Sequence, residues 1–161
     1  MGPTGDPHGD SERPVVVRIR RLPHADGLPL PGRASAGAAG LDLRAAVGDP
    51  VELGPGAIAR IPTGFAVEVP PGYELQIRPR SGLAASRGVT LPNAPATIDS
   101  DYRGEITVAL INLGGEPFHV ERGMRIAQMV LARVPGLAWE EVPELTPTAR
   151  GAGGFGHTGL S

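Results

Sequence analysis

An acidic turn near the middle of the chain carries residue types that could activate a water molecule. Residues 93–105 read NAPATIDSDYRGE, so a turn-rich run leads through Ile98 to Asp99 and then to Tyr102. An apolar run, residues 106–113, follows at once. This order predicts a hairpin or tight loop that feeds a central strand, with Asp99 at the mouth of that strand. A carboxylate held there could orient and deprotonate water, although a lone Asp in a turn is usually a solvated turn residue.

Two other segments could contact an anion or a nucleotide. Residues 79–82, PRSG, join a predicted strand to a predicted helix start, where an arginine, a hydroxyl and free N–H groups form a natural anion site. An ordinary helix cap explains them equally well. The C-terminal stretch offers Arg150, glycines that let the backbone approach phosphates, and Phe155, which could stack on a base. A disordered C-terminus is the simpler explanation of that stretch.

Missing residue types exclude several chemistries. There is no cysteine, which removes thiolate nucleophiles and cysteine-ligated zinc, and the four histidines are scattered without ligand spacing. There is also no lysine, since all fifteen basic residues are arginines. A Schiff base and a lysine-containing phosphate loop are therefore excluded. Any bound polyphosphate must be held by arginines, backbone N–H groups and a metal ion.

Length and charge indicate one domain without a strongly charged partner. The chain has 161 residues and a net charge of -2, so no field for binding nucleic acid is expected. No apolar run is long enough to span a membrane, and residues 1–14 do not resemble a signal peptide, so the cytoplasm is the expected location. We predict a flexible N-terminal tail at 1–14, a β domain at 15–143 and a glycine-rich arm at 144–161.

The apolar pattern predicts short strands separated by turns. The strict alternation at 73–78, YELQIR, is the clearest period-two signal. One short helix is expected at 81–87, capped by Ser81 and closed by Gly88. Many short strands with one helix are typical of an antiparallel sandwich or jelly roll. The other predicted strands are residues 15–20, 41–45, 57–61, 65–69, 89–91, 106–113, 118–120 and 124–134.

Five segments in one order resemble the motifs of the trimeric deoxyuridine triphosphatases. They are AGLDL at 39–43, PRSG at 79–82, the 93–105 turn, GMRIAQ at 123–128 and RGAGGFGHTG at 150–159. The resemblance covers nearly the whole chain, from about residue 15 to residue 159. It implies an all-β antiparallel jelly roll or distorted barrel of the β-clip type, with one short helix and a flexible C-terminal arm. It also implies a homotrimer whose active sites are shared, the arm of one chain closing a site on its neighbours.

The same resemblance implies a role for each matching residue. Asp99 matches the general base that activates water against the α-phosphorus of dUTP, releasing dUMP and pyrophosphate, and an unperturbed Asp is ionised at neutral pH. Tyr102 would lie against the deoxyribose and exclude a 2′-hydroxyl. A bound Mg²⁺ would bridge the triphosphate, with Asp42 acting on it through water. The implied uracil and sugar positions are Asn93, Thr97, Ile98, Tyr102 and Phe155, and the phosphate positions are Arg80, Ser81, Gly82, Gln128, Arg150, His157 and Thr158.

Two positions depart from the family pattern. Ala96 stands where relatives usually have Gly, and a backbone that needed positive φ there would be strained by alanine, which would weaken uracil binding. His157 stands where many relatives have Ser, but an imidazole can still donate a hydrogen bond to phosphate.

Two other functions stay open at this point. A dCTP deaminase shares the fold, but it uses a catalytic glutamate where this chain has Arg103, and a cation cannot serve as that base. A non-catalytic trimeric binding module is the second alternative. Asp99, Tyr102, Arg150 and Phe155 together argue against it, because a scaffold needs none of them.

Overall fold

The computed structural model describes residues 14–154 and shows an all-β protein, as predicted. Every strand pairing in this part of the chain is antiparallel. The elements in chain order are β1 (Arg18–Arg21), η1 (a 3-10 turn, Pro23–Ala25), β2 (Leu41–Arg44), β3 (Val51–Leu53), β4 (Ile58–Glu68), β5 (Tyr73–Arg78), α1 (Ser81–Arg87), β6 (Val89–Thr90), β7 (Ala96–Ile98), β8 (Glu105–Asn112), β9 (Phe118–Val120) and β10 (Arg125–Arg133).

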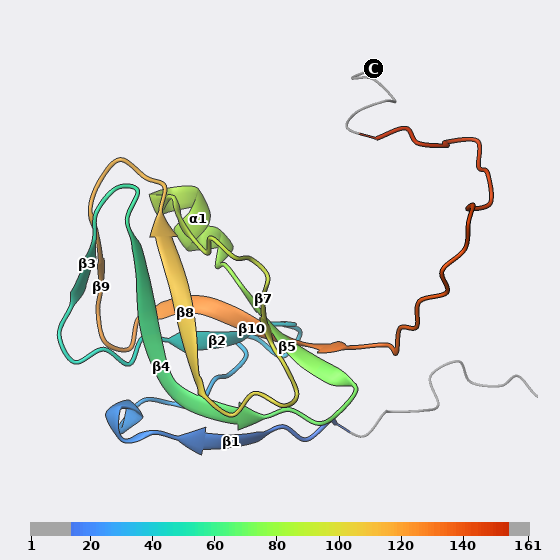
Figure 1. Cartoon of the computed structure of the whole chain (residues 1–161). Helices are drawn as coiled ribbons and strands as arrows, with labels where there is room; N and C mark the ends of the chain where they lie inside the picture. The colour runs from blue at the N-terminus through green and yellow to red at the C-terminus, as the bar shows by residue number, and fades with distance from the viewer. Residues whose placement is uncertain (1–13, 155–161) are drawn as a thin grey trace, which may run out of the picture.

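Two four-stranded sheets enclose the core (Figure 1). One has the order β1-β4-β8-β6 and the other β2-β10-β5-β7, while β3 and β9 form a separate two-stranded ribbon. Period-two alternation sends one face of each strand inward. In β8, for example, Ile106, Val108 and Leu110 are buried, whereas the residues between them are partly exposed. They pack against Leu75 and Ile77 of β5 in one continuous cluster.

Strand β4 is one continuous strand where the sequence pattern predicts two. Residues 57–61 and 65–69 were expected as distinct strands, but Ile58–Glu68 form a single strand along β8. The register shifts between Pro62 and Ala66, where Pro62 has no N–H and Gly64 adopts φ 74°. These residues build a bulge that bends the strand without ending it.

Strand β1 is shorter than predicted. It begins at Arg18 and not at residue 15, because Arg18 pairs with Glu68, the last residue of β4, and the partner strand ends there.

Helix α1 has the predicted length but not the predicted N-terminal cap. It ends at Gly88, which adopts φ 68° and donates its N–H to the Ala84 carbonyl. Its N-cap residue is Arg80, with extended backbone and no side-chain cap bond, so the expectation that Ser81 caps the helix is wrong. Ser81 is already the first helical residue, and its hydroxyl therefore cannot take the cap position.

The chain after β10 lies away from the two sheets (Figure 1). Residues 134–154 contain no strand or helix and carry exposed apolar side chains, including Leu137, Trp139 and Leu145. Trp139 is 90% exposed, so this segment buries little apolar surface within one chain. No helix in the described part of the chain is long and apolar enough to cross a membrane.

Candidate active site

The acidic segment crosses from one sheet to the other. Strand β7 pairs with β5, so that Ala96 lies opposite Ile77, while β8 belongs to the other sheet. Of the two predicted forms, hairpin or tight loop, the structure shows the loop: β7 and β8 are not paired, and residues 99–104 are the crossing between them. Asp99 follows the last residue of β7 directly, and its carbonyl accepts the N–H of Tyr102 at 3.2 Å. The crossing therefore begins with a tight turn that holds Asp99 near Tyr102.

One cavity of about 320 Å³ collects the predicted residues of this segment. Asp99 is exposed at its edge, where water can reach the carboxylate. Arg60 of β4 also lines it, and it was not predicted because it belongs to none of the motifs and stands in a mostly apolar strand. The cavity is lined by Arg60, Asn93, Ala96, Thr97, Ile98, Asp99, Tyr102, Glu105, Thr107 and Ala109.

Ala96 lies within strand β7, whose backbone is extended. Any residue adopts that conformation without strain. The strain that alanine would cause in a left-handed backbone therefore does not arise at this position. The preceding Ala94–Pro95 peptide is cis.

Tyr102 is held by a contact within its own turn. Its hydroxyl donates to the backbone carbonyl of Glu105 at 2.9 Å, and the side chain folds back over Gly104. A Cβ on Gly104 would lie 2.4 Å from the Tyr102 hydroxyl, a distance that real Cβ atoms do not adopt. Glycine at 104 is therefore what permits this orientation of the ring.

A second group of predicted residues gathers where β2, β10 and the start of α1 meet. Asp42 binds two arginines: Arg80 Nε lies 3.3 Å from its Oδ1, and Arg125 Nη1 lies 3.1 Å from its Oδ2. Gln128 pairs with Asp42 across the strands and donates from Nε2 to the Pro79 carbonyl at 3.0 Å. These contacts bring three separate sequence motifs together. Arg125 was not predicted, since only the register of β10 against β2 places it beside Asp42.

This second group could hold a metal ion that is bound mainly by the phosphates of a substrate. Residues 14–154 contain no cluster of three or more His, Asp or Glu side chains that could hold a metal by themselves. Mg²⁺ commonly binds through one or two carboxylates together with substrate phosphates and water. Asp42 fits that pattern, because a carboxylate that binds two arginines still has lone pairs for a water ligand.

A single chain does not bring all the predicted residues to one place. Arg80, Ser81, Gly82 and Gln128 are absent from the cavity that contains Asp99. Gln128 lines a different hollow, with Pro79 and the Ala94–Pro95 turn. Arg150 is exposed on the C-terminal segment, where its Nε donates to the Gly153 carbonyl at 2.8 Å. Phe155, His157 and Thr158 lie outside the described residues.

The family of this chain follows from its similarity to known proteins. Residues 26–159 match the family profile described as dUTPase. A deoxyuridine 5'-triphosphate nucleotidohydrolase of Rhizobium meliloti is 57% identical over 94% of this chain and 98% of its own length. The protein of that name from Sinorhizobium medicae is 59% identical over 90% of this chain and 92% of its own length.

Two solved structures share the fold at low sequence identity. The dUTPase of Staphylococcus bacteriophage 80alpha, solved as a mutant with dUpNHpp, has a TM-score of 0.77 and 24% identity, covering 90% of this chain and 99% of its own. The dUTPase of phage phi11 of S. aureus, solved as a mutant with a structural Mg(II) ion, has a TM-score of 0.71 and 21% identity, covering 80% and 97%. At this identity they support the fold alone. The family profile and the two bacterial relatives carry the assignment: this chain belongs to the dUTPase family.

Proposed function

We propose that this protein is a Mg²⁺-dependent dUTP diphosphatase that works as a homotrimer with shared active sites. The activity is supported by membership of the dUTPase family. The observation that carries the mechanism is the cavity in which exposed Asp99 lies with Asn93, Thr97, Ile98 and Tyr102. That cavity therefore contains both a carboxylate that could deprotonate water and side chains that could bind a nucleoside.

Asp99 is the general base in this mechanism. Its carboxylate accepts a proton from a water molecule whose oxygen then bonds to the α-phosphorus of dUTP. The bond between that phosphorus and the oxygen that bridges it to the β-phosphorus breaks, so dUMP and pyrophosphate leave. Asp99 lies on the solvent-facing side of its turn and can therefore exchange the proton with bulk water after each turnover.

Strand β7 offers the base-recognition surface. It is the last strand of its sheet, so its outer edge has backbone N–H and C=O groups without strand partners. Uracil presents an acceptor–donor–acceptor edge that such a strand can pair with. Asn93, Thr97 and Ile98 line the same cavity as Tyr102, so we assign the first three to uracil and Tyr102 to the sugar.

We assign phosphate binding to the second group of residues, where β2, β10 and the start of α1 meet. Arg80 is held in place by Asp42, and Ser81 and Gly82 supply N–H groups in the first turn of α1. A fixed arginine loses less freedom on binding phosphate than a mobile one. When bound, Mg²⁺ supplies neutralisation of the triphosphate charge, and Asp42 would hold it through water.

The separation of the two groups supports a site built from several chains. Within one chain, Asp99 and Gln128 line different cavities, and Arg80, Ser81 and Gly82 do not line the cavity that contains Asp99. Residues 134–154, which include Arg150, lie away from the two sheets and expose Leu137, Trp139 and Leu145. Both features are satisfied if the arm packs on a neighbouring subunit and brings Arg150, Phe155, His157 and Thr158 to that subunit's site.

Pyrophosphate release tests the activity directly. We expect turnover of dUTP with Mg²⁺ and little with dTTP, dCTP or UTP. Replacing Asp99→Asn is expected to abolish turnover while binding of a dUTP analogue survives. Asp101→Asn is the matched control, because Asp101 is an exposed acid two residues away that does not line the cavity. Ammonia release from dCTP would favour a deaminase, and absence of turnover on every nucleotide would favour a binding module.

Mixed oligomers test the shared sites. Asp99→Asn chains alone are expected to be inactive, and chains lacking residues 151–161 alone are expected to keep at most about a tenth of kcat/KM. After the two are unfolded and refolded together, about a quarter of the sites in random trimers receive both an intact Asp99 and an intact arm from different chains. Recovery of activity therefore supports sharing. Mixed trimers of verified composition without recovered activity would contradict it.

A further inference from the structure

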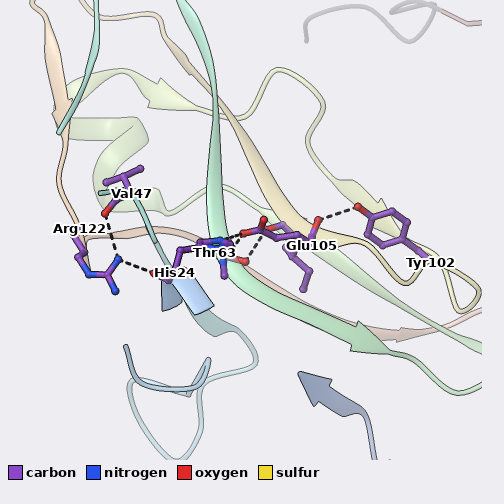
Figure 2. A network of polar contacts seen from close by, with 8 residues as sticks. His24, Val47, Thr63, Tyr102, Glu105 and Arg122 are labelled. Carbon is purple, nitrogen blue, oxygen red and sulfur yellow. Dashed lines mark hydrogen bonds and ion pairs between the residues drawn. The ribbon is translucent and has the colours of Figure 1, made fainter. Parts of the chain in front are cut away.

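A chain of polar contacts runs from Tyr102 through Glu105, which both line the cavity, to the η1 turn (Figure 2). The Glu105 carbonyl accepts the Tyr102 hydroxyl at 2.9 Å. On the same residue, the carboxylate oxygen Oε1 lies 2.8 Å from His24 Nε2 and accepts the Gly64 N–H at 2.7 Å. We propose that Glu105 is a positioning residue whose anchored carboxylate fixes the orientation of Tyr102, and thereby sets the preference of the site for deoxyribose over ribose. This inference rests on the sugar role proposed for Tyr102.

The first anchor is the bulge of β4. Gly64 is buried at φ 74°, and a Cβ there would lie 2.2 Å from the Cβ of Ala25. Because the register of β4 against β8 breaks between Pro62 and Ala66, the Gly64 N–H has no partner in the ladder. A buried N–H without a partner is unfavourable, so its bond to the Glu105 carboxylate is strongly preferred. The bulge therefore fixes one side of Glu105.

The second anchor is the η1 turn. Ala25 is fully buried in a small cluster with Leu28, Ala46 and Phe65. Arg122 binds the turn from the other side, with Nη1 donating to the His24 carbonyl at 2.9 Å and Nη2 to the Asp26 carbonyl at 2.8 Å. An ionised carboxylate only accepts hydrogen bonds, so His24 Nε2 is the donor to Glu105. His24 and Glu105 are both partly exposed, so their contact adds little to the stability of the fold, and its main effect is to orient the Glu105 side chain.

The anchored residue is rigidly coupled to Tyr102. Thr63 donates to the carbonyl of Ile106, the residue after Glu105, at 2.6 Å and is itself fully buried. Glu105 is thus held through its side chain and through its neighbour in β8. Its carbonyl is the acceptor that orients the Tyr102 hydroxyl, and Gly104 leaves the space for the ring. A group that discriminates by steric contact must be held to about half an ångström, which such a second layer of contacts provides.

Steady-state kinetics of the full-length enzyme on dUTP and UTP tests the proposal. We expect Glu105→Ala to raise KM for dUTP and to lower the dUTP-over-UTP ratio of kcat/KM roughly tenfold, with kcat within about twofold, since only positioning is lost. Glu105→Gln keeps an acceptor oxygen and is expected to restore most of the ratio. Glu68→Ala is the control, because it removes a 3.1 Å ion pair to Arg18 from β4 without touching Tyr102.

A double-mutant cycle tests whether Glu105 acts through Tyr102. We expect the double variant Tyr102→Phe with Glu105→Ala to lower the dUTP-over-UTP ratio of kcat/KM no further than the stronger single variant does. Both substitutions act on the same contact, the one that orients Tyr102. Losses that multiply would overturn the proposal, as would a Glu105→Ala protein that melts at lower temperature but keeps the ratio. If Glu105→Gln is as inactive as an Asp99 variant, Glu105 takes part in the chemistry and the positioning role is wrong.

Two further results separate this inference from the proposed function. If Tyr102→Phe and Tyr102→Ala leave the dUTP-over-UTP ratio unchanged, the sugar role of Tyr102 fails and the inference fails with it, while dUTP hydrolysis stands. If Glu105→Ala does not fold, His24→Ala removes only one anchor and is expected to lower the ratio by a smaller, roughly threefold factor. An unchanged ratio in His24→Ala would then refute the proposal.

Discussion

Asn112 is the buried polar residue whose removal is expected to affect stability most. It is fully buried at the end of β8, and its Nδ2 donates at 2.8 Å to the carbonyls of both Leu53 and Glu116. Its Oδ1 accepts the Gly114 N–H at 2.9 Å. Three hydrogen bonds at about 1 kcal/mol each give a loss of about 3 kcal/mol for Asn112→Ala. For a chain of this size that corresponds to about 9 °C in melting temperature.

Thr63→Val calibrates this estimate within the same protein. Thr63 is also fully buried, but its hydroxyl makes one hydrogen bond, to the Ile106 carbonyl, and valine keeps its shape. The expected loss is about 1 kcal/mol, or about 3 °C. Thermal unfolding at one fixed protein concentration measures both variants, and a dUTP assay at 25 °C checks that Asn112→Ala, whose side chain does not line the Asp99 cavity, stays active. A smaller loss for Asn112→Ala than for Thr63→Val would refute the hydrogen-bond reasoning.

Three further outcomes are expected. Deleting residues 151–161 leaves a trimer with unchanged melting temperature but lowers kcat/KM for dUTP at least roughly tenfold, and full activity of the truncated protein would show that the arm is dispensable. Gly104→Ala displaces the Tyr102 hydroxyl and raises KM for dUTP several-fold, measurable by steady-state kinetics, because the new Cβ would occupy the place of that oxygen. Arg80→Ala weakens binding of a dUTP analogue and also frees Asp42 from one partner, so calorimetry with dUTP analogue and with dUMP is expected to show a loss only for the ligand that carries the triphosphate.

Local patterns in the sequence predicted the regular elements well. The alternation at Tyr73–Arg78 gives β5, and small residues closed by Gly88 give α1, because in both cases the signal lies within one element. Residues of the 93–105 motif share one cavity, and the roles assigned to Asp99 and Tyr102 there stay predictions.

Contacts between distant segments could not be predicted in this way. Strand β3 was not predicted, and β7 was missed because residues 93–96 were interpreted as a turn-rich run, whereas β7 forms only by pairing with β5 earlier in the chain. The continuity of β4 was hidden because Pro62 and Gly64 usually mark a break, whereas here they form a bulge against β8. His24 and Glu105 are 81 positions apart, so only the packed fold brings them together.

The crossing at residues 99–104 makes Asp99, the proposed general base, sensitive to substitutions far from it. Its two ends are fixed to different sheets, since β7 moves with β5 and β8 moves with β4. A change that thickens or thins the apolar layer between the sheets, for instance at Leu75 or Val108, alters the span that this short connection has to cover. Variants deep in the interior are thus expected to change turnover as well as folding, and screens for stabilised forms of this enzyme would best monitor both.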